Sequence, residues 1–112
     1  MTDIEAAPFR DRDGDEIEGT RINADGTVTL FLDKKVRVMS EEVAELKFRR
    51  FTPQDLIKLD RVKGANAQNI ELLRLLANVP SSAIENLDAA DFTAAVRVSS
   101  GFTTKSRTVG EG

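Results

Sequence analysis

Apolar and polar residues alternate along the N-terminal half of the chain. The stretches TVTLFLDKKVRVM (residues 27–39) and VAELKFRR (residues 43–50) contain runs in which every second residue is apolar, with an interruption at residues 33–35. A period of two gives a β-strand one apolar face. The alternating apolar positions are Val28, Leu30, Leu32, Val36, Val38, Leu46 and Phe48. The pattern predicts a small antiparallel β-sheet or hairpin with one face to be covered.

A turn signal precedes the longer strand. The segment EIEGTRI (residues 16–22) is followed by NADG, in which Asn23, Asp25 and Gly26 tolerate the left-handed backbone of a tight turn. Thr27 and the residues after it are β-branched or bulky, as strands prefer. We therefore expect a hairpin around residues 23–26.

The period changes to that of helices after residue 50. Thr52 is a good N-cap residue, Pro53 suits the first helical position, and Asp55 complements the positive end of the helix. We expect this helix to end near Gly64 and to cover the sheet. Its apolar side would consist of Leu56, Ile57, Leu59 and Val62.

Further helical segments follow. Residues 67–78 contain apolar side chains at helical spacing over more than half of the circumference, and Pro80 ends this helix. A short turn over residues 82–87 and a last helix capped by Asp88, with Gly101 near its end, complete the pattern. The fold class is therefore α+β: a small antiparallel β-sheet or hairpin in the N-terminal half, followed by three to four short α-helices. We expect residues 1–15 to form a flexible acidic arm, residues 16–102 a single α+β domain, and residues 103–112 a disordered tail.

Composition narrows the chemistry. The 112-residue chain contains no Cys, His, Trp or Tyr, which removes thiolate and imidazole ligands and disulfides together. It has neither a glycine-rich phosphate loop nor a nucleophile elbow, and its acids occupy positions that helix caps and solvated faces favour. We expect no catalytic residue, cofactor or metal. Because no apolar run approaches the ~20 residues of a membrane span, we expect a protein of the cytoplasm without membrane contact.

Charge varies along the chain. Residues 1–33 carry nine acids and three bases, whereas residues 34–63 carry five acids and nine bases. The basic middle is interleaved with acids, so it lacks the one-signed stripe that phosphate binding favours, and we expect no nucleic-acid binding. The acidic stretch DRDGDEIEG (residues 11–19) does not fit a calcium loop of the EF-hand type. With Asp11 as first ligand, the obligatory glycine would be Glu16, and the final glutamate would be Ile22.

Two groups of residues are candidates, one for a structural junction and the other for partner binding. Arg49 and Arg50 precede the first helix, and an ion pair to Asp55 or Asp60 would hold the strand end to the helix start. With Thr52 they define a structural junction. The leucine-rich helix and the last helix supply candidate partner-binding residues, because a chain this short has little mass to cover every apolar face. These candidates are Leu72, Leu75, Leu76, Val79, Phe92 and Val96.

The run ELKFRRFTPQDLIKLDRVKG followed by ELLRLLANVPSSAIENLDAADFTAAVRVSSGF resembles the small tail assembly chaperones of long-tailed bacteriophages and prophages. The resemblance extends over about residues 27–102. It departs at Phe51, where such sequences often have Pro. The residues that carry it are Glu45, Leu46, Phe48, Arg49, Arg50, Thr52, Asp55, Leu56, Leu72, Leu76, Pro80, Ile84, Leu87, Asp88, Asp91 and Phe92.

The resemblance implies a non-catalytic protein that binds the phage tape measure protein, keeps it soluble and is displaced as tail tube subunits assemble around it. It also implies a location in the bacterial cytoplasm and absence from the mature virion. Self-association is expected as well, since many weak contacts along one client give avidity. Two alternatives stay open: a structural subunit of the virion, such as a tail completion or adaptor protein, and a small nucleic-acid-binding regulator. The regulator would use Lys47, Arg49, Arg50, Lys58, Arg61 and Lys63.

Overall fold

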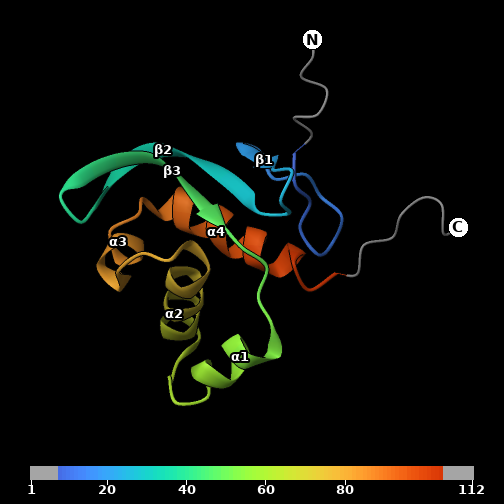
Figure 1. Cartoon of the computed structure of the whole chain (residues 1–112), viewed down its shortest axis with the longest axis vertical. Coiled ribbons are helices and arrows are strands. Elements are labelled where there is room, and N and C mark those ends of the chain that lie inside the picture. Colours follow the sequence, from blue (N-terminus) through green and yellow to red (C-terminus); the bar gives the residue numbers. More distant parts are fainter. Residues whose placement is uncertain (1–7, 105–112) are drawn as a thin grey trace, which may run out of the picture.

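Three strands form one antiparallel sheet in the N-terminal half of the computed structural model, which describes residues 8–104 (Figure 1). They are β1 (Thr20–Ile22), β2 (Val28–Val38) and β3 (Glu41–Phe48), in the spatial order β1-β2-β3. Leu30 lies opposite Leu46 in the register of β2 and β3, so the apolar positions of the two strands share one face. β2 is therefore the central strand, and β3 is an edge strand.

The predicted turn connects β1 to β2. The N–H of Gly26 donates to the carbonyl of Asn23 at 2.9 Å, and the N–H of Asn23 donates to the carbonyl of Thr27 at 2.8 Å. Gly26 has a φ of 91°, which glycine adopts without steric cost. The carboxylate of Asp25 accepts from both the amide and the hydroxyl of Thr27, which fixes the start of β2.

Four helices follow the sheet, which confirms the predicted α+β class. They are α1 (Pro53–Leu59), α2 (Ala65–Ala77), α3 (Ser81–Glu85) and α4 (Ala89–Gly101). The side chain of Asp88 accepts from the amide of Ala90 and so caps α4, as its sequence position predicts. Asn78 ends α2 in the left-handed conformation, with a φ of 57°. Figure 1 shows the helices on one side of the sheet, with α1 farthest from it.

The core lies between the apolar face of the sheet and helices α2, α3 and α4. The contact between α2 and β3, together with the contacts of α3 and α4 with β2, closes this face. Its buried apolar residues include Ile17, Val28, Leu30, Leu46, Phe48, Leu73, Ile84, Ala95 and Val98. The expectation that the first helix covers the sheet is wrong in one respect, because Leu56 and Ile57 of α1 remain exposed to 44% and 64%. α1 packs mainly against α2 instead.

β2 bulges in its middle, and α4 holds the bulge. The register shifts between Phe31 and Val36, so residues 32–35 have no regular partner in β3. The buried carboxylate of Asp91 in α4 accepts from the amides of Asp33 and Lys34 at 3.0 to 3.1 Å. Backbone donors that the ladder leaves unpaired therefore gain a charged acceptor.

The N-terminal segment is held against α4 in its described part. Residues 1–15 were expected to form a loose arm, yet the amide of Phe9 donates to the Thr20 hydroxyl at 2.8 Å and the amide of Ile17 donates to the carbonyl of Phe9 at 2.9 Å. The Phe9 ring lies 5.1 Å from the Phe102 ring, centroid to centroid. Residues 1–7 of the expected arm and residues 105–112 of the expected tail lie outside the described residues.

Candidate partner-binding surface

The junction between the sheet and the helices is built around one buried carboxylate. Nη1 and Nη2 of Arg49 donate to the two carboxylate oxygens of Asp55, at 2.9 and 3.0 Å, in a bidentate pair. The amide of Thr52 donates to the same carboxylate at 2.9 Å. Asp55 therefore joins the end of β3 to the first turn of α1, as the spacing of these residues suggested.

The Asp55 carboxyl is strongly acidic in the folded chain. The hydrogen bonds from the Arg49 guanidinium lower the pKa of Asp55 from its usual 3.8 to about 2, with a further contribution from the Thr52 amide and against the opposing effect of burial. The same pair raises the pKa of Arg49. This pair stays ionised throughout the physiological pH range, so it acts as a permanent clamp.

Arg50 contacts Phe102 and not Asp55 or Asp60, the two acids that the sequence suggested as its partners. Its Nη2 donates to the carbonyl of Phe102 at 2.9 Å, and its guanidinium carbon lies 5.4 Å from the centroid of the Phe102 ring. Since the Phe102 ring also packs against the Phe9 ring, three distant segments meet at the end of α4: residues 8–10, the segment after β3, and the last turn of α4.

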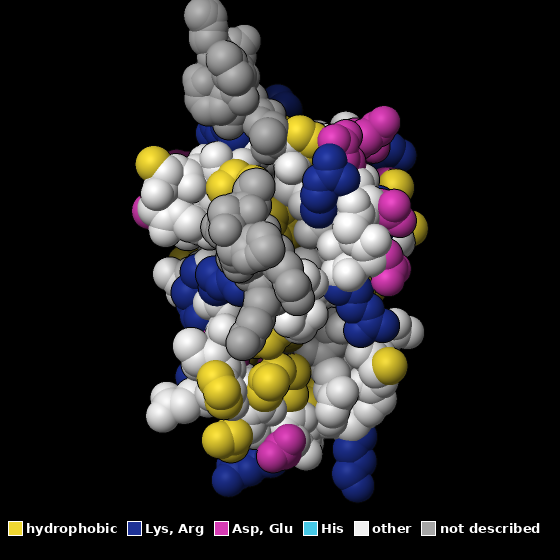
Figure 2. Space-filling model, turned by 90° about the vertical axis from the view of Figure 1, so that its right-hand side faces the viewer, with side chains coloured by type: hydrophobic (Ala, Val, Ile, Leu, Met, Phe, Trp, Pro, Cys, Tyr) yellow, Lys and Arg dark blue, Asp and Glu magenta, His cyan; other side chains and the backbone are white. Residues whose placement is uncertain are grey.

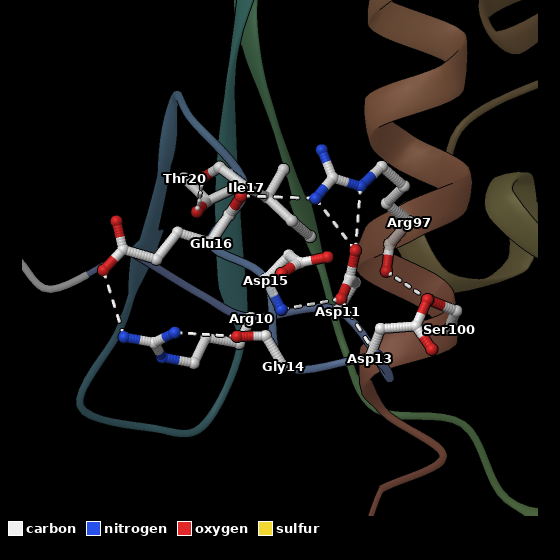
Figure 3. Close-up of polar contacts among 10 residues, drawn as sticks. All are labelled: Arg10, Asp11, Asp13, Gly14, Asp15, Glu16, Ile17, Thr20, Arg97 and Ser100. Atoms are coloured by element: carbon white, nitrogen blue, oxygen red, sulfur yellow. Dashed lines mark hydrogen bonds and ion pairs between the residues drawn. The ribbon is translucent and has the colours of Figure 1, made fainter.

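A second clamp ties the acidic loop before β1 to α4 (Figure 3). Nε and Nη2 of Arg97 donate to the same oxygen of Asp11 at 3.0 and 2.8 Å, and Nη2 also reaches the carbonyl of Glu16. The other oxygen of Asp11 accepts from the amides of Asp13 and Asp15. These contacts lower the pKa of Asp11, with the Arg97 hydrogen bond as the largest cause. The loop is thus an Asp-centred turn that binds an arginine of its own chain.

No cluster of three or more carboxylates suited to a metal ion occurs within residues 8–104. The helices in the same range are all too short or too polar to cross a membrane.

The structure separates the predicted partner-binding residues into two groups. Leu72 and Leu76 belong to the core, with exposed fractions of 7% and 3%, because α2 is packed against β3, α1, α3 and α4 together. The sequence argument underestimated how many neighbours this short chain provides for α2. The half-buried members, which reach the surface at their outer edges, are Leu75, Val79, Phe92 and Val96.

Phe92 borders a shallow hollow between α2, α3 and α4. The hollow has a volume of about 340 Å³, and most of its lining is apolar, from Ile70, Ile84, Leu87, Ala89 and Phe92, with Asn66 and Glu85 at its edges. Of the predicted partner-binding residues, only Phe92 contributes to it.

The exposed large apolar side chains of the described helices lie on α1. Leu56 and Ile57 point away from the core, and a hollow of about 300 Å³ beside them is lined by Ile57, Lys58 and Arg61. Figure 2 shows apolar side chains gathered at the lower end of the molecule, with Lys or Arg below them; Figure 1 places α1 at that end. We call Leu56, Ile57, Lys58 and Arg61 the α1 surface.

Sequence reasoning placed the apolar residues of the α1 surface in the core, although one signal argued otherwise. Adjacent residues of a helix are turned by about 100° from one another, so Leu56, Ile57 and Leu59 cannot all face a narrow core contact on a helix of seven residues. Leu59 is the one that packs against the core.

The described chain is thus a small α+β fold whose helix α1 exposes large apolar side chains beside two cations. The sequence model of the family described as "Phage tail assembly chaperone proteins, E, or 41 or 14" matches residues 27–104. The chain therefore belongs to the phage tail assembly chaperone family, and its role lies in tail assembly. Neither the curated proteins nor the solved structures compared with the chain include a match.

Proposed function

We propose that this chain is a non-catalytic chaperone that binds the phage tape measure protein, keeps it soluble, and gives way as tail tube subunits assemble around it. The α1 surface is the observation that carries this proposal, because it combines two large exposed apolar side chains with two cations. The chaperone would act in the cytoplasm of the host and be absent from the finished virion.

The α1 surface suits a client that has an apolar stripe flanked by acidic side chains. The Ile57 side chain is 64% exposed, so a bound partner can bury it. Burying a side chain of this size would contribute up to roughly 1.5–3 kcal/mol to the free energy of binding. Lys58 and Arg61 line the same hollow, so they are placed to meet carboxylates of the client and to speed the encounter.

The half-buried edges of Leu75, Val79, Phe92 and Val96 are proposed as secondary contacts. Leu72 and Leu76 would support the site from the core without touching the client. Weak contacts of this kind are sufficient where many copies bind along one long client, because avidity multiplies them. The family membership supports a partner among the tail proteins.

Affinity capture tests the proposal. The tape measure protein from the same genome, carrying a tag, is co-expressed with the chain or with the variant Ile57→Glu, and the chain captured with the tag is quantified. Capture of the original chain and loss of capture for Ile57→Glu, with both chains equally stable, support the proposal. Thr93→Glu, on an exposed position of α4, is the matched control. If Ile57→Glu were captured as well as the original chain, the α1 surface would not be part of the binding site.

The alternative role as a virion subunit makes the opposite prediction for purified particles. A structural subunit remains in the assembled tail at a fixed copy number, whereas a chaperone is displaced. Quantitative mass spectrometry of particles therefore separates the two roles, and a stoichiometric amount of this chain in the tail would overturn the chaperone proposal.

A further inference from the structure

The outer edge of β3 offers unpaired backbone groups at two positions. The amide of Phe31 donates to the carbonyl of Gly19 at 2.7 Å, on the β1 side of β2. Phe31 therefore does not exchange hydrogen bonds with Glu45, its partner in β3. In such a non-hydrogen-bonded antiparallel pair, the backbone groups of both residues point away from one another. The N–H and C=O of Glu45 consequently face the open edge of the sheet.

The end of the same strand leads to the same conclusion. The amide of Arg49 donates to the carbonyl of Leu76 in α2 at 3.2 Å, on the side away from β2. Since the direction of backbone groups alternates along a strand, the groups of Lys47 share the open side with those of Glu45. In the part of the chain that the structure describes, no backbone hydrogen bond outside the strand ladder involves Glu45 or Lys47.

We propose that β3 pairs with β3 of a second copy of this chain, antiparallel, about a two-fold axis at Leu46. In this register Glu45 of each copy lies opposite Lys47 of the other. Both residues point their backbone groups outward, so each such pair exchanges two hydrogen bonds. The two three-stranded sheets join into one continuous sheet, and the contact is closed and symmetric.

The charges of the strand select this register. Moving the axis by one residue places Glu45 opposite Glu45, or Lys47 opposite Lys47, and like charges directly opposite one another destabilise a sheet. With the axis at Leu46, two cross-strand pairs of opposite charge form instead. Glu45 and Lys47 are both exposed, and neither makes an ion pair within residues 8–104.

The surroundings leave room for the added strand and limit its length. A hollow of about 510 Å³ opens beside this edge and is lined by residues that include Lys47, Leu75 and Ala77. The pairing ends where the Arg49 amide is taken by α2, and at the irregularity opposite the β2 bulge. Because only the centre of β3 pairs, we expect a weak, concentration-dependent dimer.

Sedimentation equilibrium over a range of concentrations tests this pairing with charge variants of the full chain. Glu45→Lys and Lys47→Glu each place like charges opposite one another, and we expect each to weaken the dimer by about tenfold or more. An equimolar mixture of the two variants restores opposite charges at both pairs and should recover the dimer. The double variant Glu45→Lys/Lys47→Glu should also dimerise.

Two controls keep the result specific. Glu41→Lys changes an exposed charge of the same strand, opposite Val38 and outside the proposed pairs, and should leave the dimer unchanged. Hydrogen exchange at the Glu45 and Lys47 amides should slow as the concentration rises. A chain that stays monomeric throughout, single variants that dimerise like the original chain, or a mixture that fails to recover would each overturn the proposal.

Discussion

The carboxylate of Asp91 accepts the backbone N–H of Asp33 with both of its oxygens, at 3.0 and 3.1 Å. The two residues are 58 positions apart, so this contact ties the bulge of the central strand to the first turn of α4. The Lys34 amide joins the same carboxylate. An irregularity in a strand thus becomes an attachment point for the last helix.

Replacing Asp91 by Ala should lower the free energy of unfolding by about 1–3 kcal/mol, because the amides of Asp33 and Lys34 lose a buried acceptor. Denaturant unfolding measures the change. Asp91→Asn keeps one acceptor oxygen and should cost less, whereas Thr93→Ala, at an exposed position of the same helix, should cost little. Equal stability of Asp91→Ala and Thr93→Ala would contradict the attachment.

The Arg49–Asp55 pair should make the stability depend on acid pH. The pKa of Asp55 is lowered from 3.8 to about 2 in the folded chain, so the unfolded chain binds more protons between these values. The stabilisation is complete above about pH 5 and is lost progressively as the pH falls through the unfolded pKa of 3.8 toward 2. Unfolding midpoints measured at pH 5, 4, 3 and 2.5 should therefore decrease in that order.

Arg49→Ala isolates the contribution of this pair from that of other carboxylates. The pKa values of Asp11 and Asp25 are also lowered by their own contacts, so some acid dependence should persist in the variant. The difference in stability between the original chain and Arg49→Ala should shrink as the pH falls from 4 to 2.5. A constant difference over this range would show that Asp55 is not the group involved.

Gly101→Ala should be destabilising although alanine favours helices. A Cβ at this position would collide with the backbone carbonyl of Arg10 and with the ring of Phe9. We expect a loss of about 1–3 kcal/mol, typical of overpacking, or release of the N-terminal segment from α4. Thermal unfolding measures the loss of stability, and limited proteolysis after Arg10 detects release of the N-terminal segment. At an unhindered helical position, Gly→Ala would instead raise the stability by roughly 0.5–1 kcal/mol.

The two groups of leucines on α2 should respond differently to truncation. Leu72→Ala opens a cavity in the core and should cost about 2–5 kcal/mol. Leu75→Ala, at a half-buried position, should cost clearly less and leave the chain folded. Denaturant midpoints of the two variants provide the comparison, and equal losses would contradict the assigned packing of α2.

Much of the fold follows from local signals in the sequence. The alternation in residues 27–39 and 43–50 predicts β2 and β3. Gly26 marks the turn before β2, Pro53 marks the start of α1, and Asp88 marks the cap of α4, each where the structure has it. These features depend on a few neighbouring residues, whose preferred backbone angles act over one or two turns.

The remaining features depend on contacts between distant residues. The Asp11–Arg97 pair spans 86 positions, and nothing near Asp11 in the sequence indicates that an arginine of α4 will meet it. The burial of Leu72 and the exposure of Ile57 were likewise misjudged, because periodicity shows that a helix has an apolar side but not which neighbours cover it.

The soluble fraction of the tape measure protein tests the central claim most directly. The protein is expressed alone, with the original chain, and with Ile57→Glu, and the soluble and total amounts are compared after centrifugation. The chaperone account predicts a large rise in the soluble fraction with the original chain and a much smaller one with Ile57→Glu. An unchanged soluble fraction with well-expressed original chain would contradict it.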